Sequence, residues 1–257
     1  MHASFFQLGR LHIPVFGVVA ALGLIAALGL SQWTARYAGL EPAVAWDAGM
    51  VGVIAAFVVS RALLIVFNLH SFLAYPLLVM AVPSLTGTGV ALTAVFLAVY
   101  LRWKRVPVLR LLNAMAPCGA LLWAFLSLGR VLDGTMDGMP TSVAWGVAAP
   151  GVAGAKVHPV EFYTLVVAAG LCVGLLGIVM RRGPVGQTAG LGMVSAGVAV
   201  FFLDFFRVPS VLFETSWMDL AQFVGVGMVV VGGLVLTRHA GRAAVEEREQ
   251  IGVSNAV

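Results

Sequence analysis

The sequence predicts an all-α polytopic membrane protein: a single transmembrane domain over residues 1–257, built as a helical bundle with about seven transmembrane helices. Of its 257 residues, 61% are hydrophobic and only 10% are charged, and the mean hydropathy is +1.01. Soluble domains carry about a quarter charged residues, so lipid must be the solvent for most of this chain. Backbone groups in lipid must be hydrogen-bonded within the protein, and these apolar runs are too long for the alternating strands of a membrane barrel.

Seven apolar windows have about the length that crosses 30 Å of hydrocarbon. They fall at 13–31, 48–68, 86–101, 111–128, 160–180, 188–203 and 219–237. The first window is too long for the apolar core of a signal peptide, and no convincing cleavage site follows it. We therefore interpret it as the first retained span.

Basic residues gather in every second loop between these windows. Ten of the fifteen Lys and Arg residues lie in this set: Arg36, Arg102, Lys104, Arg105, Arg110, Arg181, Arg182, Arg238, Arg242 and Arg248. The positive-inside rule then places the N-terminus outside and the C-terminus in the cytoplasm of a bacterial inner (plasma) membrane. It also makes 129–159 an outward-facing loop and 238–257 a cytoplasmic tail.

Two other kinds of function are excluded by the same pattern. The net charge of +4 comes from residues scattered at the ends of windows, not from a basic stripe, so nucleic acid is not a predicted partner. Cys118 and Cys172 each lie inside an apolar window, and their spacing excludes a CxxC metal site. We interpret both cysteines as buried small hydrophobic residues.

A few polar residues inside the apolar windows or at their ends are candidates for function. Arg61 lies in the middle of the second window, where an ionisable residue is costly and usually faces the interior of the bundle. Binding of an anionic head group is favoured there over a purely structural ion pair. Asp204 and Arg207 are three residues apart and could pair on one helical face. A role of these two residues in a functional site and snorkelling of their side chains to the membrane interface are equal alternatives.

The segment 129–147 is rich in glycine and polar for so apolar a chain. Gly129, Gly134 and Gly138 permit positive φ angles and close approach of the backbone. Arg130 offers a planar fork of donors that suits phosphate, although an interfacial arginine can also anchor to lipid head groups.

His158 and Pro159 open the fifth apolar window, and the interfacial Tyr163 follows them. Histidine titrates near neutral pH, so His158 is a candidate for proton transfer. A lone interfacial histidine is, however, more often a hydrogen-bonded structural residue.

The order of these pieces resembles the prolipoprotein diacylglyceryl transferase family, which moves diacylglycerol from phosphatidylglycerol to the cysteine thiol of a bacterial lipoprotein precursor. The resemblance covers almost the whole chain. It rests on Phe16-Gly17 (Tyr-Gly in the family), Arg61 (in a Gly-Gly-Arg-like helix), Ser84-Leu85-Thr86-Gly87 (Ser-Phe-His-Gly-Gly), Gly129-Arg130 with Asp133-Gly134, Gly138-Met139-Pro140-Thr141 and Trp145-Gly146-Val147 (the signature loop), His158-Pro159 with Tyr163 (His-Pro-x-Gln-Leu-Tyr-Glu), and Asp204-Phe205-Phe206-Arg207-Val208-Pro209 (Glu-Phe-x-Arg-x-Pro).

Three polar positions of the family are replaced in this chain. Thr86 stands for a histidine, Phe16 for a tyrosine and Val200 for an arginine. The signature loop is also a few residues shorter after Arg130, which leaves the register of this arginine open. A paralogue of the same fold that binds a lipid or lipoprotein without transferring anything is therefore the alternative. A transporter is disfavoured because no repeat is visible.

The resemblance also implies the partners and the roles of the residues. Its substrates are phosphatidylglycerol and the signal peptide of a lipoprotein precursor, among other membrane lipids, and it needs no metal or nucleotide cofactor. Arg130 and Arg207, with Arg61 as a third candidate in the lining of the same cavity, would hold the lipid phosphate and stabilise the departing glycerol phosphate, and His158 would take the thiol proton. The implied substrate-binding residues are Arg61, Gly129, Asp133, Gly134, Gly138, Tyr163 and Asp204.

Overall fold

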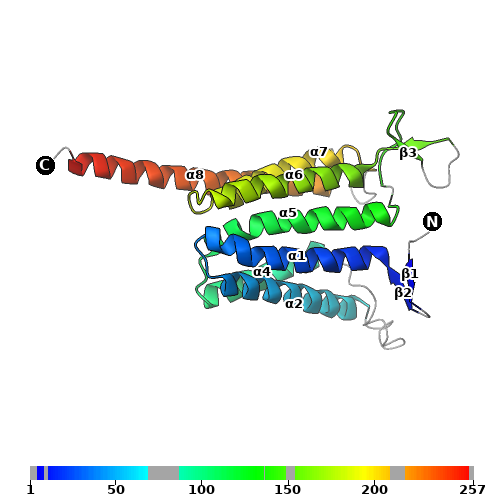
Figure 1. Cartoon of the computed structure of the whole chain (residues 1–257), viewed down its shortest axis with the longest axis horizontal. Coiled ribbons are helices and arrows are strands. Elements are labelled where there is room, and N and C mark those ends of the chain that lie inside the picture. The colour runs from blue at the N-terminus through cyan, green and yellow to red at the C-terminus, as the bar shows by residue number, and fades with distance from the viewer. Residues whose placement is uncertain are drawn as a thin grey trace.

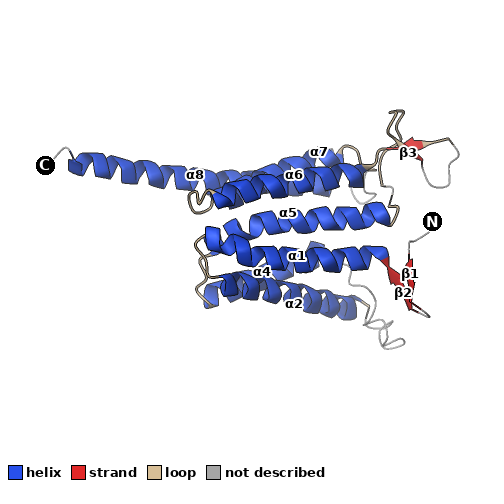
Figure 2. Ribbon diagram, in the orientation of Figure 1, coloured by secondary structure: helices blue, strands red, loops and turns tan. Residues whose placement is uncertain are grey.

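The computed structural model describes residues 5–8, 11–68, 87–135, 137–148, 154–208 and 218–254. Within these ranges it is an all-α bundle, as the composition predicts (Figures 1 and 2). Its helices are α1 (Val15–Tyr37), α2 (Pro42–Phe67), α4 (Gly87–Trp103), α5 (Val108–Leu132), α6 (Val160–Met180), α7 (Gln187–Asp204) and α8 (Leu220–Ser254). Each of the seven predicted windows coincides with one of these helices.

Six of the described helices are long and apolar enough to cross a bilayer: α1, α2, α5, α6, α7 and the Leu220–Arg238 part of α8. Helix α4 is apolar but has 17 residues. At 1.5 Å per residue it is about 26 Å long, close to the hydrocarbon thickness of about 30 Å. The chain is therefore a multi-pass membrane protein.

One predicted boundary is wrong. Helix α5 runs to Leu132, so Gly129 and Arg130 lie in its last turn and not in a loop that begins at 129. Helix α8 continues to Ser254, but the part of it that could cross a membrane is Leu220–Arg238, in agreement with the predicted window 219–237. The apolar but proline-interrupted stretch 69–85, together with Thr86, lies outside the described residues.

Short strands gather at one end of the bundle. Strands β1 (Phe5–Leu8) and β2 (Leu11–Pro14) form an antiparallel hairpin before α1, and β3 (Val147–Ala148) pairs with β4 (Lys156–Val157) between α5 and α6. Figure 1 shows β1, β2 and β3 at the same end, whereas α8 extends beyond the opposite end. The end with the strands is called the loop end below.

Helix α5 lies between the two halves of the bundle, and buried polar contacts fix it there. The Thr34 hydroxyl of α1 donates to the Ala114 carbonyl of α5 at 2.8 Å, inside the bundle. The Asn113 amide oxygen accepts the Ala189 backbone N–H at 2.9 Å. This bond satisfies one of the free N–H groups in the first turn of α7. Both contacts fix α5, which carries Arg130 to the loop end.

Glycines let α7 and α8 approach each other closely. Gly190 and Gly197 of α7 face Gly232 and Gly225 of α8, seven residues apart on each helix. A Cβ at Gly225 would lie 2.7 Å from the Gly197 carbonyl oxygen, and one at Gly232 would lie 2.7 Å from the Gly190 carbonyl oxygen. In lipid, the hydrophobic effect does not drive helices together, so association depends on close packing. Small residues at such crossings allow that packing.

Gly225→Ala is therefore expected to destabilise the bundle by about 1–3 kcal/mol, the usual cost of overpacking against backbone. The matched control is Gly227→Ala, two residues along the same helix, where an added Cβ meets nothing within 4 Å. Thermal unfolding in detergent should show a lower midpoint for Gly225→Ala and an unchanged or higher one for Gly227→Ala. Equal midpoints for the two variants would contradict this packing.

Candidate functional site

The last turn of α5 carries the first candidate, Arg130. The preceding Gly129 is buried, and a Cβ there would lie 3.0 Å from Cδ2 of Phe16, so glycine allows α1 to pack directly on this turn. The helix then ends at Leu132 with Asp133 as its C-cap, and Gly134 has a φ of +72°, a conformation that favours glycine. This close packing of α1 on α5 fixes the position from which the Arg130 side chain extends.

Two arginines from different elements meet one buried carboxylate. Nη1 of Arg130 lies 3.1 Å from Oε1 of Glu161, and Nη2 of Arg207 lies 2.9 Å from the same oxygen. The Glu161 side chain is 5% exposed, whereas those of Arg130 and Arg207 are 44% and 30% exposed. The arginine side chains are therefore partly accessible to a ligand, whereas the carboxylate of Glu161 is buried.

Glu161 lies in the first turn of α6, where the helix dipole stabilises negative charge. Its second oxygen, Oε2, is buried and accepts no hydrogen bond from the residues that the structure describes. The carboxylate charge is thus balanced by Arg130 and Arg207 within this part of the chain. We call these three residues the arginine–glutamate cluster.

The segment 137–141 positions Arg207 and His158 through its backbone. The Met139 N–H donates to the Phe206 carbonyl at 2.8 Å, and the His158 N–H donates to the Met139 carbonyl at 3.0 Å. Gly138 is bridged to Arg207, and any Cβ at Gly138 would collide with the backbone of His158. Only glycine therefore lets this segment lie between the start of α6 and the end of α7.

His158 belongs to a separate aromatic group. Its Nδ1 lies 3.4 Å from the Tyr163 hydroxyl, which accepts a hydrogen bond from Nε1 of Trp145 at 2.8 Å. The His158 ring also stacks edge-on against Phe206, with 5.1 Å between centroids. His158 is therefore held by protein contacts on several sides. Among the residues that the structure describes, His158 forms no ion pair.

Two cavities adjoin these groups. A polar cavity of about 210 Å³ is lined by Trp123, Arg130, Thr164, Val200, Leu203, Asp204, Arg207 and Ala221. A larger one of about 430 Å³ is lined by Val131, Thr135, Trp145, Val147, Pro159, Glu161, Phe162 and Tyr163. The first cavity has the two arginines in its wall, and the second has Glu161 and the aromatic group in its wall. The arginine–glutamate cluster therefore adjoins both.

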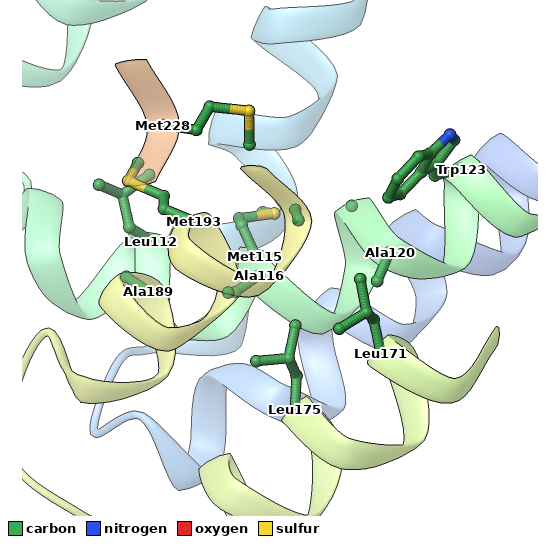
Figure 3. Close-up of a pocket in the computed structure, with 13 residues that line it drawn as sticks. Leu112, Met115, Ala116, Ala120, Trp123, Leu171, Leu175, Ala189, Met193 and Met228 are labelled. Atoms are coloured by element: carbon green, nitrogen blue, oxygen red, sulfur yellow. The ribbon is translucent and has the colours of Figure 1, made fainter. Parts of the chain in front are cut away.

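An apolar cavity of about 310 Å³ lies further along the bundle, between α5, α6, α7 and α8 (Figure 3). Figure 3 shows Met115, Leu175, Met193 and Met228 around it. Trp123 lines both this cavity and the polar one that contains Arg130 and Arg207. One tryptophan is therefore shared by the apolar cavity and the cavity with the two arginines.

The other predicted site residues lie apart from the cluster or contact it differently. Arg61 is on α2, where its guanidinium carbon lies 5.2 Å from the centroid of the Phe57 ring. Arg61 does not line the polar cavity, so the prediction that it lies there with Arg130 and Arg207 is wrong. Asp204 does line it, but the predicted pairing of Asp204 with Arg207 is wrong, because helix α7 ends at Asp204 and Arg207 reaches across to Glu161.

Sequence reasoning missed Glu161. It lies three residues after His158, at the start of an otherwise apolar helix, and this isolated acid was the available signal. An acid in a first turn is, however, typical of helix starts. Its partners are 31 and 46 residues away in sequence, so local spacing could not reveal the pairing.

Several known proteins are similar to this chain. A family model described as "Prolipoprotein diacylglyceryl transferase" matches residues 3–238. Proteins named phosphatidylglycerol–prolipoprotein diacylglyceryl transferase are similar over most of the chain. The one from Geobacter sulfurreducens is 29% identical over 80% of this chain and 82% of its own length. Those from Clostridium tetani and Coxiella burnetii are 23% and 24% identical, each over 90% of this chain and over 95% and 92% of their own lengths.

Proposed function

The chain belongs to the prolipoprotein diacylglyceryl transferase family, and we propose that it transfers diacylglycerol from phosphatidylglycerol to the cysteine thiol of a lipoprotein precursor. The observation that carries this proposal is the pair of arginines in the wall of one cavity. A phosphodiester is an anion, and guanidinium groups with free donors are suited to bind it. Nothing in the fold or in the relatives favours the alternative of a non-catalytic paralogue.

The cavities match the two ends of a phospholipid. The phosphate of the head group would lie against Arg130 and Arg207, and an acyl chain would pass Trp123 into the apolar cavity of Figure 3. Binding of the lipid would thus combine charge-assisted hydrogen bonds at one end with apolar burial at the other. Gly129, Asp133, Gly134 and Gly138 would shape the backbone beside the head group, with Asp204 lining the same cavity as the arginines.

The chemistry requires one bond to form and one to break. The thiol sulfur bonds to the glyceryl carbon that bears the phosphate, and the bond from that carbon to the phosphate oxygen breaks. The electron pair leaves with glycerol phosphate, and the thiol proton passes to a base. Arg130 and Arg207 would stabilise the charge that develops on the leaving group.

His158 is the proposed base. The free thiol has a pKa near 8.5, so removal of its proton assists the attack near neutral pH. The Tyr163 hydroxyl beside Nδ1 would orient the imidazole ring. Arg61 is proposed to contact an anionic head group from α2, separately from the two arginines of the cluster.

A transfer assay tests this function directly. The purified protein in nanodiscs that contain phosphatidylglycerol should add a diacylglyceryl group to a peptide with a lipobox cysteine, as mass spectrometry would show. The same peptide with serine in place of the cysteine should stay unmodified. A correctly folded protein that binds phosphatidylglycerol but forms no thioether would instead establish the binding-only paralogue.

We also propose that the N-terminus faces the outside of a bacterial inner membrane and the C-terminus the cytoplasm, from the distribution of Lys and Arg. A C-terminal fusion to a reporter enzyme that is active only outside the cytoplasm should be silent. The same reporter inserted after Ala148, at the loop end, should be active. The reverse pattern would overturn this orientation.

A further inference from the structure

One carboxylate holds both arginines of the proposed phosphate site. Because Nη1 of Arg130 and Nη2 of Arg207 lie 3.1 Å and 2.9 Å from the same oxygen of Glu161, the two nitrogens are at most about 6 Å apart. Two guanidinium groups at this spacing repel each other, and the repulsion is strong where water is scarce. The negative charge of Glu161 offsets this repulsion. Glu161 is buried, whereas both arginines are partly exposed.

The geometry of the cluster leaves the arginines available. Glu161 engages one nitrogen atom of each guanidinium, and each arginine has five N–H donors. Arg130 and Arg207 both line the polar cavity, and Glu161 is not among its lining residues. The carboxylate therefore holds the two side chains from outside the polar cavity, and does not occupy the space in which an anion would bind.

The charge of the cluster also distinguishes the substrate from the product. The phosphodiester of phosphatidylglycerol carries one negative charge, whereas a phosphate monoester carries about 1.5 to 2 at pH 7. Two arginines without an acid would attract the monoester more strongly than the diester. Glu161 lowers the positive charge behind the cavity by one unit, and the carboxyl group of Asp204 lies in the wall of the same cavity.

We infer that Glu161 is a positioning residue of the transferase reaction: it holds Arg130 and Arg207 side by side as one phosphate clamp, and its charge lets the departing glycerol phosphate leave. This inference rests on the proposed function, because it takes the clamp to bind the lipid phosphate. It assigns two separable contributions to one side chain, the geometry of the clamp and its charge.

Two substitutions separate these contributions. Glu161→Gln keeps an oxygen that can accept from both arginines but removes the charge. The clamp should stay in place, so the KM for phosphatidylglycerol should not rise, while glycerol phosphate should bind about tenfold more tightly and kcat should fall. Glu161→Ala removes both contributions, the arginines should separate, and the KM for phosphatidylglycerol should rise by about tenfold or more.

The experiment measures KM, kcat and, independently of turnover, the binding of glycerol phosphate to the purified protein by calorimetry. Glu41→Gln, the same change at an exposed acid before α2, is the matched control and should alter none of these values. If Glu161→Gln binds glycerol phosphate no more tightly than the wild type, the charge role is overturned. If Glu161→Ala keeps the wild-type KM, the positioning role is overturned.

The failure of the proposed function would be distinguishable from the failure of this inference. A wild-type protein that forms no thioether would refute transfer. The glycerol phosphate titration of Glu161→Gln and the wild type would still show whether the carboxylate sets the affinity of the two arginines for a phosphate monoester.

Discussion

Arg130→Gln is expected to abolish detectable diacylglyceryl transfer. Glutamine can still donate a hydrogen bond but carries no charge, and the substrate phosphate is anionic in the ground state and in the transition state. Hydrogen bonds to charged groups contribute up to about 3 kcal/mol, which is more than a hundredfold in rate. Glu161 would also lose one of its two cationic partners.

The comparison variant is His158→Gln, which should retain measurable activity. A positioned base contributes 10²–10⁴-fold in typical enzymes, but water can replace part of this contribution for a thiol that is a few per cent ionised at neutral pH. Initial rates should be measured for both variants at saturating peptide, with membrane insertion and thermal unfolding as controls. Equal losses, or a steeper loss for His158→Gln, would refute the leading role given to Arg130.

Gly138→Ala is expected to lower the transfer rate by about tenfold or more while the helical bundle stays intact. A Cβ at Gly138 would lie 2.9 Å from the carbonyl carbon of His158 and 3.1 Å from its nitrogen. Both atoms belong to the backbone, so they cannot move aside as a flexible side chain would. This segment lies outside the helices, so the added Cβ would be accommodated by displacing the segment that is bridged to Arg207, and the packing of the helices would not change.

Gly170→Ala is the matched control for this substitution. Gly170 is exposed on α6, and an added Cβ there meets nothing within 4 Å. The thermal unfolding midpoints of both variants should stay close to that of the wild type, and only Gly138→Ala should lose transfer. A wild-type rate for Gly138→Ala would show that the position of this segment does not matter to the site.

The helices could be predicted from the sequence because lipid imposes a single requirement on each of them. A run of apolar residues long enough to cross hydrocarbon is visible in the sequence itself, so every predicted window coincides with a helix. The end of α5 is not visible in the same way. Because the apolar window ends at 128 and a glycine-rich polar segment follows, the sequence predicts a loop at Arg130, but Gly129 is buried in the helix by its contact with Phe16 of α1, 113 residues earlier.

The candidate site was predictable only as a set of residue types. The motifs name Arg130, Arg207 and His158, and the resemblance assigns both arginines to one phosphate, but nothing in the sequence indicates the carboxylate that both arginines contact. Arg207 was expected to pair with Asp204 on its own helix, yet the chain turns after Asp204 and the guanidinium meets Glu161 on α6. Such pairings depend on how α5, α6 and α7 pack, and no local spacing contains that information.

The most direct test of this account is the structure of the protein with phosphatidylglycerol bound, determined in nanodiscs. We expect the lipid phosphate within hydrogen-bond distance of both Arg130 and Arg207, with Glu161 still in contact with the two guanidinium groups and an acyl chain beside Trp123. A phosphate that contacts neither arginine, or that replaces Glu161 between them, would contradict the account.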